Sequence, residues 1–80
     1  MYYRIIHFTL LAPSLWAMIN QFKNNNVKII KLADNKGLII ESFENASHAG
    51  KSTNVLASMQ SMKSQAMAKV LVEEGIEINN

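Results

Sequence analysis

The sequence predicts one α+β domain in which two helices pack on one face of an antiparallel sheet. Three observations lead to this prediction. A run rich in aromatic and β-branched residues opens the chain, two more such runs follow with a short connection between them, and apolar residues recur at helical spacing in the second half. The 80 residues are enough for a single small domain, 1–80.

Residues 2–10 predict a buried strand, because aromatic and β-branched side chains favour extended backbone. Pro13 then suits the first turn of a helix, where its missing N–H needs no partner. Leu15, Met18 and Phe22 follow at helical spacing and would form the apolar side of that helix. The three asparagines at 24–26 tolerate left-handed backbone and predict its end.

The apolar run at residues 5–19 follows Arg4 and therefore resembles a signal peptide. It is shorter than the roughly 20 residues of a membrane span, and it contains His7 and Pro13. Removing it would also take much of the apolar surface from a small core. We therefore expect this run to belong to the folded domain, the protein to be cytoplasmic and no membrane to be a partner.

Residues 27–32 and 38–43 predict two strands of a hairpin. The connecting residues, 33–37, read Ala-Asp-Asn-Lys-Gly and predict the loop between them. Gly37 is expected to adopt a positive φ in this loop, since glycine carries no Cβ to oppose it.

The residues after Thr53 allow two interpretations. In the first, one helix runs from Thr53 to about Glu74, Gly75 closes it, and residues 76–78 add a short strand. In the second, the helix stops near Ser64 and residues 68–73 form the last strand. Periodicity alone does not separate a helix end from an alternating strand here.

Both interpretations give the order strand, helix, strand, strand, helix, with a fourth strand expected at the end. This order predicts the split βαβ, or ferredoxin-like, βαββα(β) plan, an antiparallel sheet with two helices on one face.

Catalytic and metal-binding residues are not predicted. The chain has no cysteine, which excludes disulfides and thiolate metal sites. His7 and His48 have no acidic or histidine neighbour at the spacing of a metal site. The six acidic residues offer no spaced pair in an evident cleft, and no serine has an assignable base. We expect a protein that is not an enzyme, with no cofactor, and the net charge of +2 does not require a nucleic acid.

A four-residue sequence, Gly50-Lys51-Ser52-Thr53, is similar to part of the phosphate-binding loop of nucleotide hydrolases. That loop needs a small residue, normally glycine, where this sequence has Asn45, and it also needs a parallel sheet. We therefore expect a helix start, with Ser52 or Thr53 as its cap.

Lys36-Gly37, followed by the strand that ends at Phe43, is similar to the third-strand motif of RNA-recognition-motif domains. Leu38 and Ile40 stand where that family has its base-stacking aromatics. The resemblance implies a βαββαβ plan and binding of RNA or single-stranded nucleic acid. The residues expected to carry that binding are Tyr3, Arg4, His7, Lys28, Lys31, Phe43 and Lys51.

The second helix predicts a contact surface. Its outer side is small and uncharged where a solvated helix usually carries Glu and Lys, so another chain could approach closely. Trp16 lies beside the apolar stripe of the first helix and is a candidate interface anchor. The partner-binding residues expected on this basis are Trp16, Ala57, Ser58, Ser61, Ser64 and Gln65.

These observations favour a small non-catalytic regulatory or accessory module that binds a protein partner or forms a homo-oligomer. Nine Asn, nine Ile and seven Lys against one Arg indicate an AT-rich gene, which fits a phage or mobile element and an inhibitor of a host protein. The alternative is the nucleic-acid-binding module described above. Weakening of binding with salt would distinguish the two, because phosphate contacts are screened and apolar contacts are not.

Overall fold

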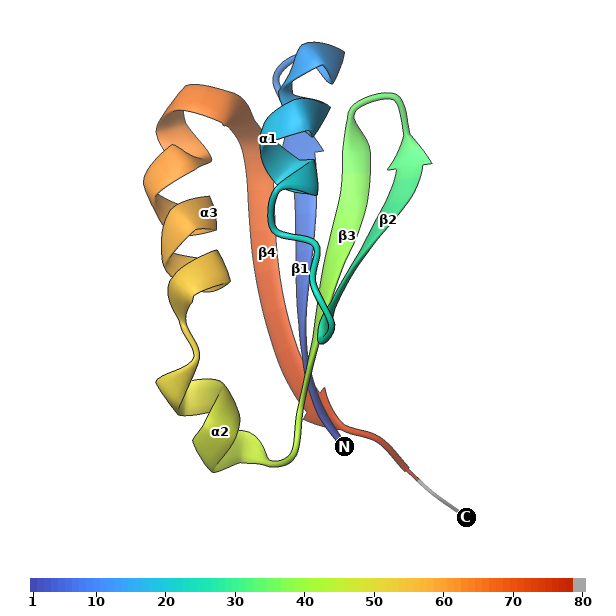
Figure 1. The fold of residues 1–80 in the computed structure, drawn as a ribbon. Helices are drawn as coiled ribbons and strands as arrows, with labels where there is room; N and C mark the ends of the chain where they lie inside the picture. The colour runs from blue at the N-terminus through green and yellow to red at the C-terminus, as the bar shows by residue number, and fades with distance from the viewer. Residues whose placement is uncertain (79–80) are drawn as a thin grey trace.

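Residues 1–78, which the computed structural model describes, contain four strands and four short helices. The strands form one antiparallel sheet in the order β2-β3-β1-β4, and the helices lie on one side of it (Figure 1). The described residues therefore form a small α+β fold, as predicted. In chain order the elements are β1 (Tyr2–Leu10), the 3-10 helix η1 (Pro13–Leu15), α1 (Trp16–Asn20), β2 (Val27–Ala33), β3 (Lys36–Phe43), α2 (Ala46–Lys51), α3 (Asn54–Ala66) and β4 (Met67–Ile76).

The first strand, β1, has the bounds that the sequence predicts and lies between β3 and β4. Its side chains alternate strictly between the two faces, as extended backbone requires. Ile6, Phe8 and Leu10 point to the helix side and are buried, with 0–3% of each residue exposed. Ile19 of α1 and Met59 of α3 complete the core above them and are also fully buried.

The β2–β3 hairpin is tighter than the sequence predicts. Lys36 and Gly37 already belong to β3, and only Asp34 and Asn35 lie between the strands. No residue of the described chain has a positive φ, so the predicted left-handed glycine is wrong. Gly37 is needed for space instead, because a Cβ there would lie 2.6 Å from the Trp16 ring and 2.5 Å from the Ile30 carbonyl oxygen.

The second interpretation of the carboxy-terminal half is confirmed, and the single helix to Glu74 is wrong. Helix α3 ends at Ala66, and β4 begins at once with Met67 and runs to Ile76. Gly75 is paired with Tyr3 inside the strand, so it closes no helix, and no separate strand forms at 76–78. The segment pairs its backbone N–H and C=O groups with the free edge of β1. This pairing outweighs the helical spacing of its apolar residues.

The predicted helix start at Gly50–Thr53 is confirmed for α3, which begins at Asn54 with Thr53 at its N-cap position. A helix absent from the sequence prediction, α2, contains Gly50 and Lys51, and its cap is Asn45, whose Oδ1 accepts the His48 N–H at 2.8 Å. Thr53 precedes α3, but neither it nor Ser52 makes a side-chain capping bond. The prediction of a hydroxyl cap is therefore wrong. None of the helices in residues 1–78 has the length and apolar character needed to cross a membrane.

Candidate functional site

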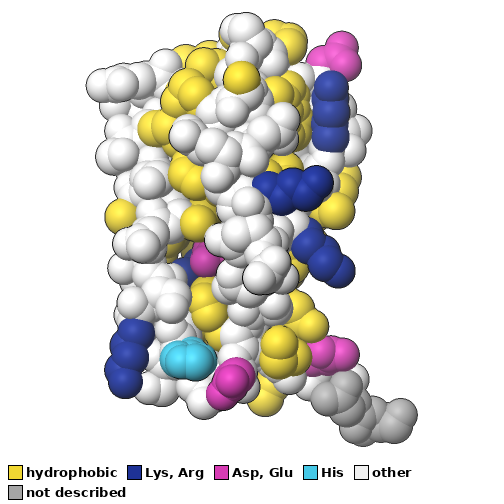
Figure 2. Space-filling view, in the orientation of Figure 1, with side chains coloured by type: hydrophobic (Ala, Val, Ile, Leu, Met, Phe, Trp, Pro, Cys, Tyr) yellow, Lys and Arg dark blue, Asp and Glu magenta, His cyan; other side chains and the backbone are white. Residues whose placement is uncertain are grey.

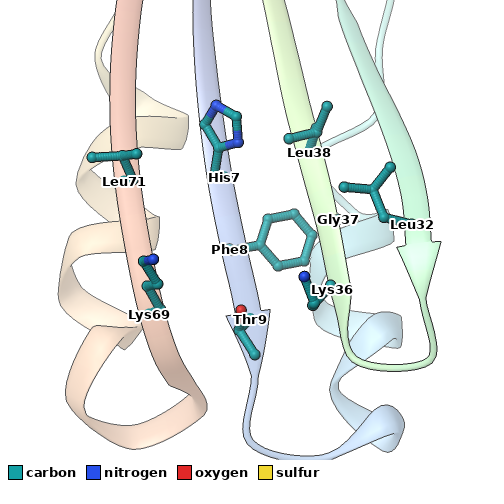
Figure 3. Close-up of a pocket in the computed structure, with 9 residues that line it drawn as sticks. All are labelled: His7, Phe8, Thr9, Leu32, Lys36, Gly37, Leu38, Lys69 and Leu71. Carbon is teal, nitrogen blue, oxygen red and sulfur yellow. The ribbon is translucent and has the colours of Figure 1, made fainter.

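The side of the sheet opposite the helices has no covering layer among residues 1–78 (Figure 3). We call this surface the open face. The cross-strand register arranges its side chains in rows that run from β2 through β3 and β1 to β4. The first row is Lys28, Ile40, Ile5 and Glu73, and the second row is Ile30, Leu38, His7 and Leu71.

Large apolar side chains cross the open face from β2 to β4. Ile30 is 40% exposed and Leu71 is 49% exposed, although both lie on regular strands. Between them Leu38 and His7 are half-buried by their neighbours, and Leu32 at the end of β2 is 58% exposed. Contiguous exposed apolar surface of this kind is typical of a contact site on a small protein.

A shallow pocket of about 340 Å³ lies in this apolar area. His7 and Leu38 stand side by side above it on neighbouring strands, and Leu32 and Leu71 flank them on the two outer strands (Figure 3). Its remaining lining consists of Phe8, Thr9, Lys36, Gly37 and Lys69.

Charged groups lie at the border of the open face. The Nε2 atom of His7 is 2.9 Å from the Glu73 carboxylate, which links the middle of the face to its β4 edge. Lys28 stands on the β2 edge of the same row as Glu73. Lys36 and Lys69 flank Thr9 one row beyond His7, at the end of the pocket that these three residues also line. The second row of the face is therefore mainly apolar, with Lys28 and Glu73 at the ends of the first row and two lysines, Lys36 and Lys69, one row beyond it.

The helix side contains the second notable cluster, a buried ion pair. Arg4 is 1% exposed and Glu41 is 2% exposed, and Nη1 of Arg4 lies 3.5 Å from Oε1 of Glu41. The guanidinium also donates to Glu74 at 3.0 Å, to the Ser52 carbonyl at 2.8 Å and to the Ala49 carbonyl at 2.6 Å. Arg4 thus ties the end of α2 to the sheet.

The two carboxylates around Arg4 respond in opposite ways. Desolvation by burial raises the pKa of Glu41, and the attraction of Arg4 only partly opposes this. Hydrogen bonds from Arg4 and Tyr2 lower the pKa of the more exposed Glu74. Among the described residues, Oε1 of Glu41 has no hydrogen-bond partner.

A polar hollow of about 240 Å³ lies beside Glu41, between the residues that lead into β2 and the start of α3. Figure 2 shows apolar side chains between α1 and α3. The hollow is lined by Asn24, Asn26, Val27, Glu41, Lys51, Ser52, Asn54 and Val55.

The residues expected to bind nucleic acid do not share one surface. Tyr3, His7 and Lys28 lie on the open face. Arg4 and Phe43 lie on the helix side and are buried, with the guanidinium 5.2 Å from the centre of the Phe43 ring. Lys31 covers the Trp16 ring at 5.5 Å, also on the helix side, and Lys51 ends α2.

The residues expected to bind a protein partner lie on α3, apart from Trp16. On α3, Ala57, Ser61, Ser64 and Gln65 are exposed, and Ser58 is half-buried. Trp16 packs at the edge of the core. Its ring lies edge-on against Phe8, with 5.4 Å between the ring centres, and its Nε1 donates to the Asp34 carbonyl at 2.6 Å.

The sequence analysis did not identify the open-face apolar residues, although a signal for them exists. Residues 29–30, 39–40 and 70–72 are consecutive aliphatic residues. In a strand such runs place apolar side chains on both faces, a pattern typical of sheets covered on both sides. The helices cover only one face, so half of this apolar set is left without a layer of its own.

No protein-family model and no curated protein sequence matches this chain. Within residues 1–78, no group of three or more His, Asp or Glu side chains is placed to hold a metal ion.

Proposed function

We propose that this chain is a non-catalytic protein-binding module whose binding surface is the open face of the sheet. The observation that carries the proposal is the uncovered apolar area formed by Ile30, Leu38 and Leu71. Burying such area gives about 25 cal/mol per Å², which is the main driving force of protein association. The apolar middle with a charged border is also typical of protein interfaces.

A ferredoxin-like βαββαβ plan is part of the proposal. It is supported by the strand order β2-β3-β1-β4, in which β3 lies between β1 and β2 and β4 closes the other side of β1. The helices on one side of the sheet support it as well (Figure 1). In this plan the open face remains free for a partner.

The module is proposed to act in the cytoplasm as an accessory or regulatory factor, and the AT-rich residue usage supports a phage or mobile-element inhibitor of a host protein. The outer side of α3 is the alternative surface for such a host partner. Its exposed residues, among them Ala57 and Ser61, are small and uncharged, which favours close approach of another backbone.

Matched surface variants test which surface binds. Leu71→Arg places a charge in the open face at an exposed position, and Ser61→Arg places the same charge on α3. Tagged protein is cross-linked in lysate of the native host, the captured protein is identified, and binding is reconstituted with purified components. The proposal expects binding by wild type and Ser61→Arg and its loss in Leu71→Arg. Equal binding by all three would contradict it.

Binding of RNA or single-stranded nucleic acid is the second candidate. It is supported by two rings, Tyr3 and His7, on the same face as Lys28 and Lys69. Aromatic stacking beside lysines is the usual design of single-strand binding. Fluorescence anisotropy with mixed oligonucleotides tests it. This candidate requires binding that weakens steeply with salt and a slope reduced by about one unit in Lys28→Ala. Absence of binding at low salt and tens of micromolar protein would remove it.

A further inference from the structure

We propose that the partner on the open face is a second copy of this chain, packed face to face about a two-fold axis that runs parallel to the strands between β1 and β3. This inference rests on the proposed function and names the occupant of its binding surface. It is carried by the order of charges and apolar side chains along the rows of the open face.

The symmetry fixes which strands meet. A two-fold axis along the strands reverses the order β2-β3-β1-β4 in the second copy but keeps each row at its own height. Strand β2 of one copy therefore lies over β4 of the other, and β3 lies over β1. Such an interface is isologous, so every contact across it occurs twice.

The first row is complementary to itself in charge under this operation. Its ends are Lys28 on β2 and Glu73 on β4, and its middle is Ile40 and Ile5. Superposing the reversed row places Lys28 over Glu73 of the second copy, and Ile40 over Ile5. Aligned sheets cross at about 30°, and the long Lys and Glu side chains can span the resulting offset at the edges.

The second row is complementary in its apolar character. Ile30 on β2 would lie over Leu71 of the second copy, so the two most exposed apolar side chains of this row cover each other. Leu38 would lie over His7 of the second copy. The shallow pocket spans this row and the row of Lys36, Thr9 and Lys69, so the same two rows of the second copy would lie over it and close it to solvent.

A two-fold axis perpendicular to the strands, through the second row, does not give this match. It would place β2 over β2 and move Lys28 to the level of Leu32 and Lys36 instead of Glu73. The charge pattern therefore favours the axis parallel to the strands.

The size of the face indicates a weak dimer. Four strands about 4.8 Å apart and four rows about 7 Å apart, which pass through Tyr3, Ile5, His7 and Thr9 of β1, give roughly 500 Å² per copy. The total of about 1,000 Å² is at the low end of specific interfaces. We therefore expect a dissociation constant in the micromolar range and a dimer that exchanges readily.

A charge-reversal cycle tests the pairing. Lys28→Glu, Glu73→Lys and the double variant are compared with wild type by sedimentation equilibrium between about 5 and 500 µM, with circular dichroism to verify folding. Each single reversal puts like charges together at two symmetric places and is expected to weaken the dimer at least tenfold. The double variant restores opposite charges and is expected to return within about threefold of wild type. Lys63→Glu, on α3, is the matched control and should leave the dimer unchanged.

The outcomes separate this inference from the proposed function. Rescue in the double variant supports the proposed dimer. A wild-type dimer without rescue overturns the proposed axis, and a wild-type monomer at all concentrations overturns self-association. In that last case a host protein whose binding is lost in Leu71→Arg would leave the proposed function standing. The proposed function itself would fail if Leu71→Arg left every association of the chain unchanged.

Discussion

At the scale of single residues, two positions decide how tightly the sheet and helices pack. Gly37 is the point where the Trp16 ring approaches the sheet, and a Cβ there would lie 2.9 Å from Phe8 as well. Arg4 crosses from β1 to the end of α2 and satisfies two carbonyl groups. Both roles depend on contacts between residues distant in the sequence.

Gly37→Ala is predicted to destabilise the fold by about 1–3 kcal/mol, because the added methyl group meets the Ile30 backbone and two aromatic rings, which must move. Gly75→Ala is the matched control, since a Cβ there meets nothing within 4 Å. That change should be neutral or stabilising by a few tenths of a kcal/mol. Urea unfolding measures both, and equal stability of the two variants would contradict the packing role of Gly37.

The buried Glu41 predicts a pH dependence of stability. Its native pKa is raised above the ordinary value of 4.5, so folding favours its protonated form. The penalty of ionised Glu41 is full above the raised pKa and disappears as the pH falls below 4.5. Wild type should therefore gain stability relative to Glu41→Gln as the pH falls through this window.

Denaturant unfolding of both proteins between about pH 4 and 7 tests this prediction. Taking the difference between the variants cancels the opposite contribution of Glu74, whose lowered pKa removes stability as the pH falls. A constant difference, or a relative loss by wild type in acid, would contradict the assignment.

At the scale of elements, the sequence predicted strands better than helix ends. Strand β1 and the two strands of the hairpin were recovered because aromatic and β-branched runs determine them locally. The change from α3 to β4 at Ala66–Met67 was not recovered from the pattern, because Met67 and Val70 also continue the helical spacing of the apolar residues. What selects the strand is the free edge of β1, which a local pattern does not contain.

The caps of α2 and α3 provide an element-scale prediction. Asn45→Ala is expected to destabilise the protein by about 1 kcal/mol, because its side chain accepts the His48 N–H. Thr53→Ala is expected to have little effect, because the Thr53 side chain makes no capping bond. Thermal unfolding compares them, and a larger loss in Thr53→Ala would contradict this account.

The same limit applies to the candidate site. Listing basic and aromatic residues together predicted Tyr3 and Arg4 as one surface, although neighbours on a strand point to opposite faces. The pairing register was needed to separate them, and it also revealed the rows of the open face. Exposure of Ile30 and Leu71 follows from the helices covering only one side, which no local pattern shows.

At the scale of the whole molecule, residues 1–78 form a sheet with one covered and one uncovered face. The helix side contains the core, whose burial stabilises the fold, and the buried Arg4–Glu41 pair. The open face contains exposed apolar side chains that contribute less to the fold of one copy than they would to an assembly. The proposed role of the protein therefore depends on what covers that face.

Methyl-resolved NMR over a dilution series tests most directly that two copies meet through the open face. The account predicts concentration-dependent shifts at Ile5, Ile30, Ile40 and Leu71, and little change at Ala57 on the outer side of α3. Leu71→Arg should abolish these shifts while the core methyl signals remain in place. Shifts confined to α3, or spectra independent of concentration up to about 500 µM, would contradict it.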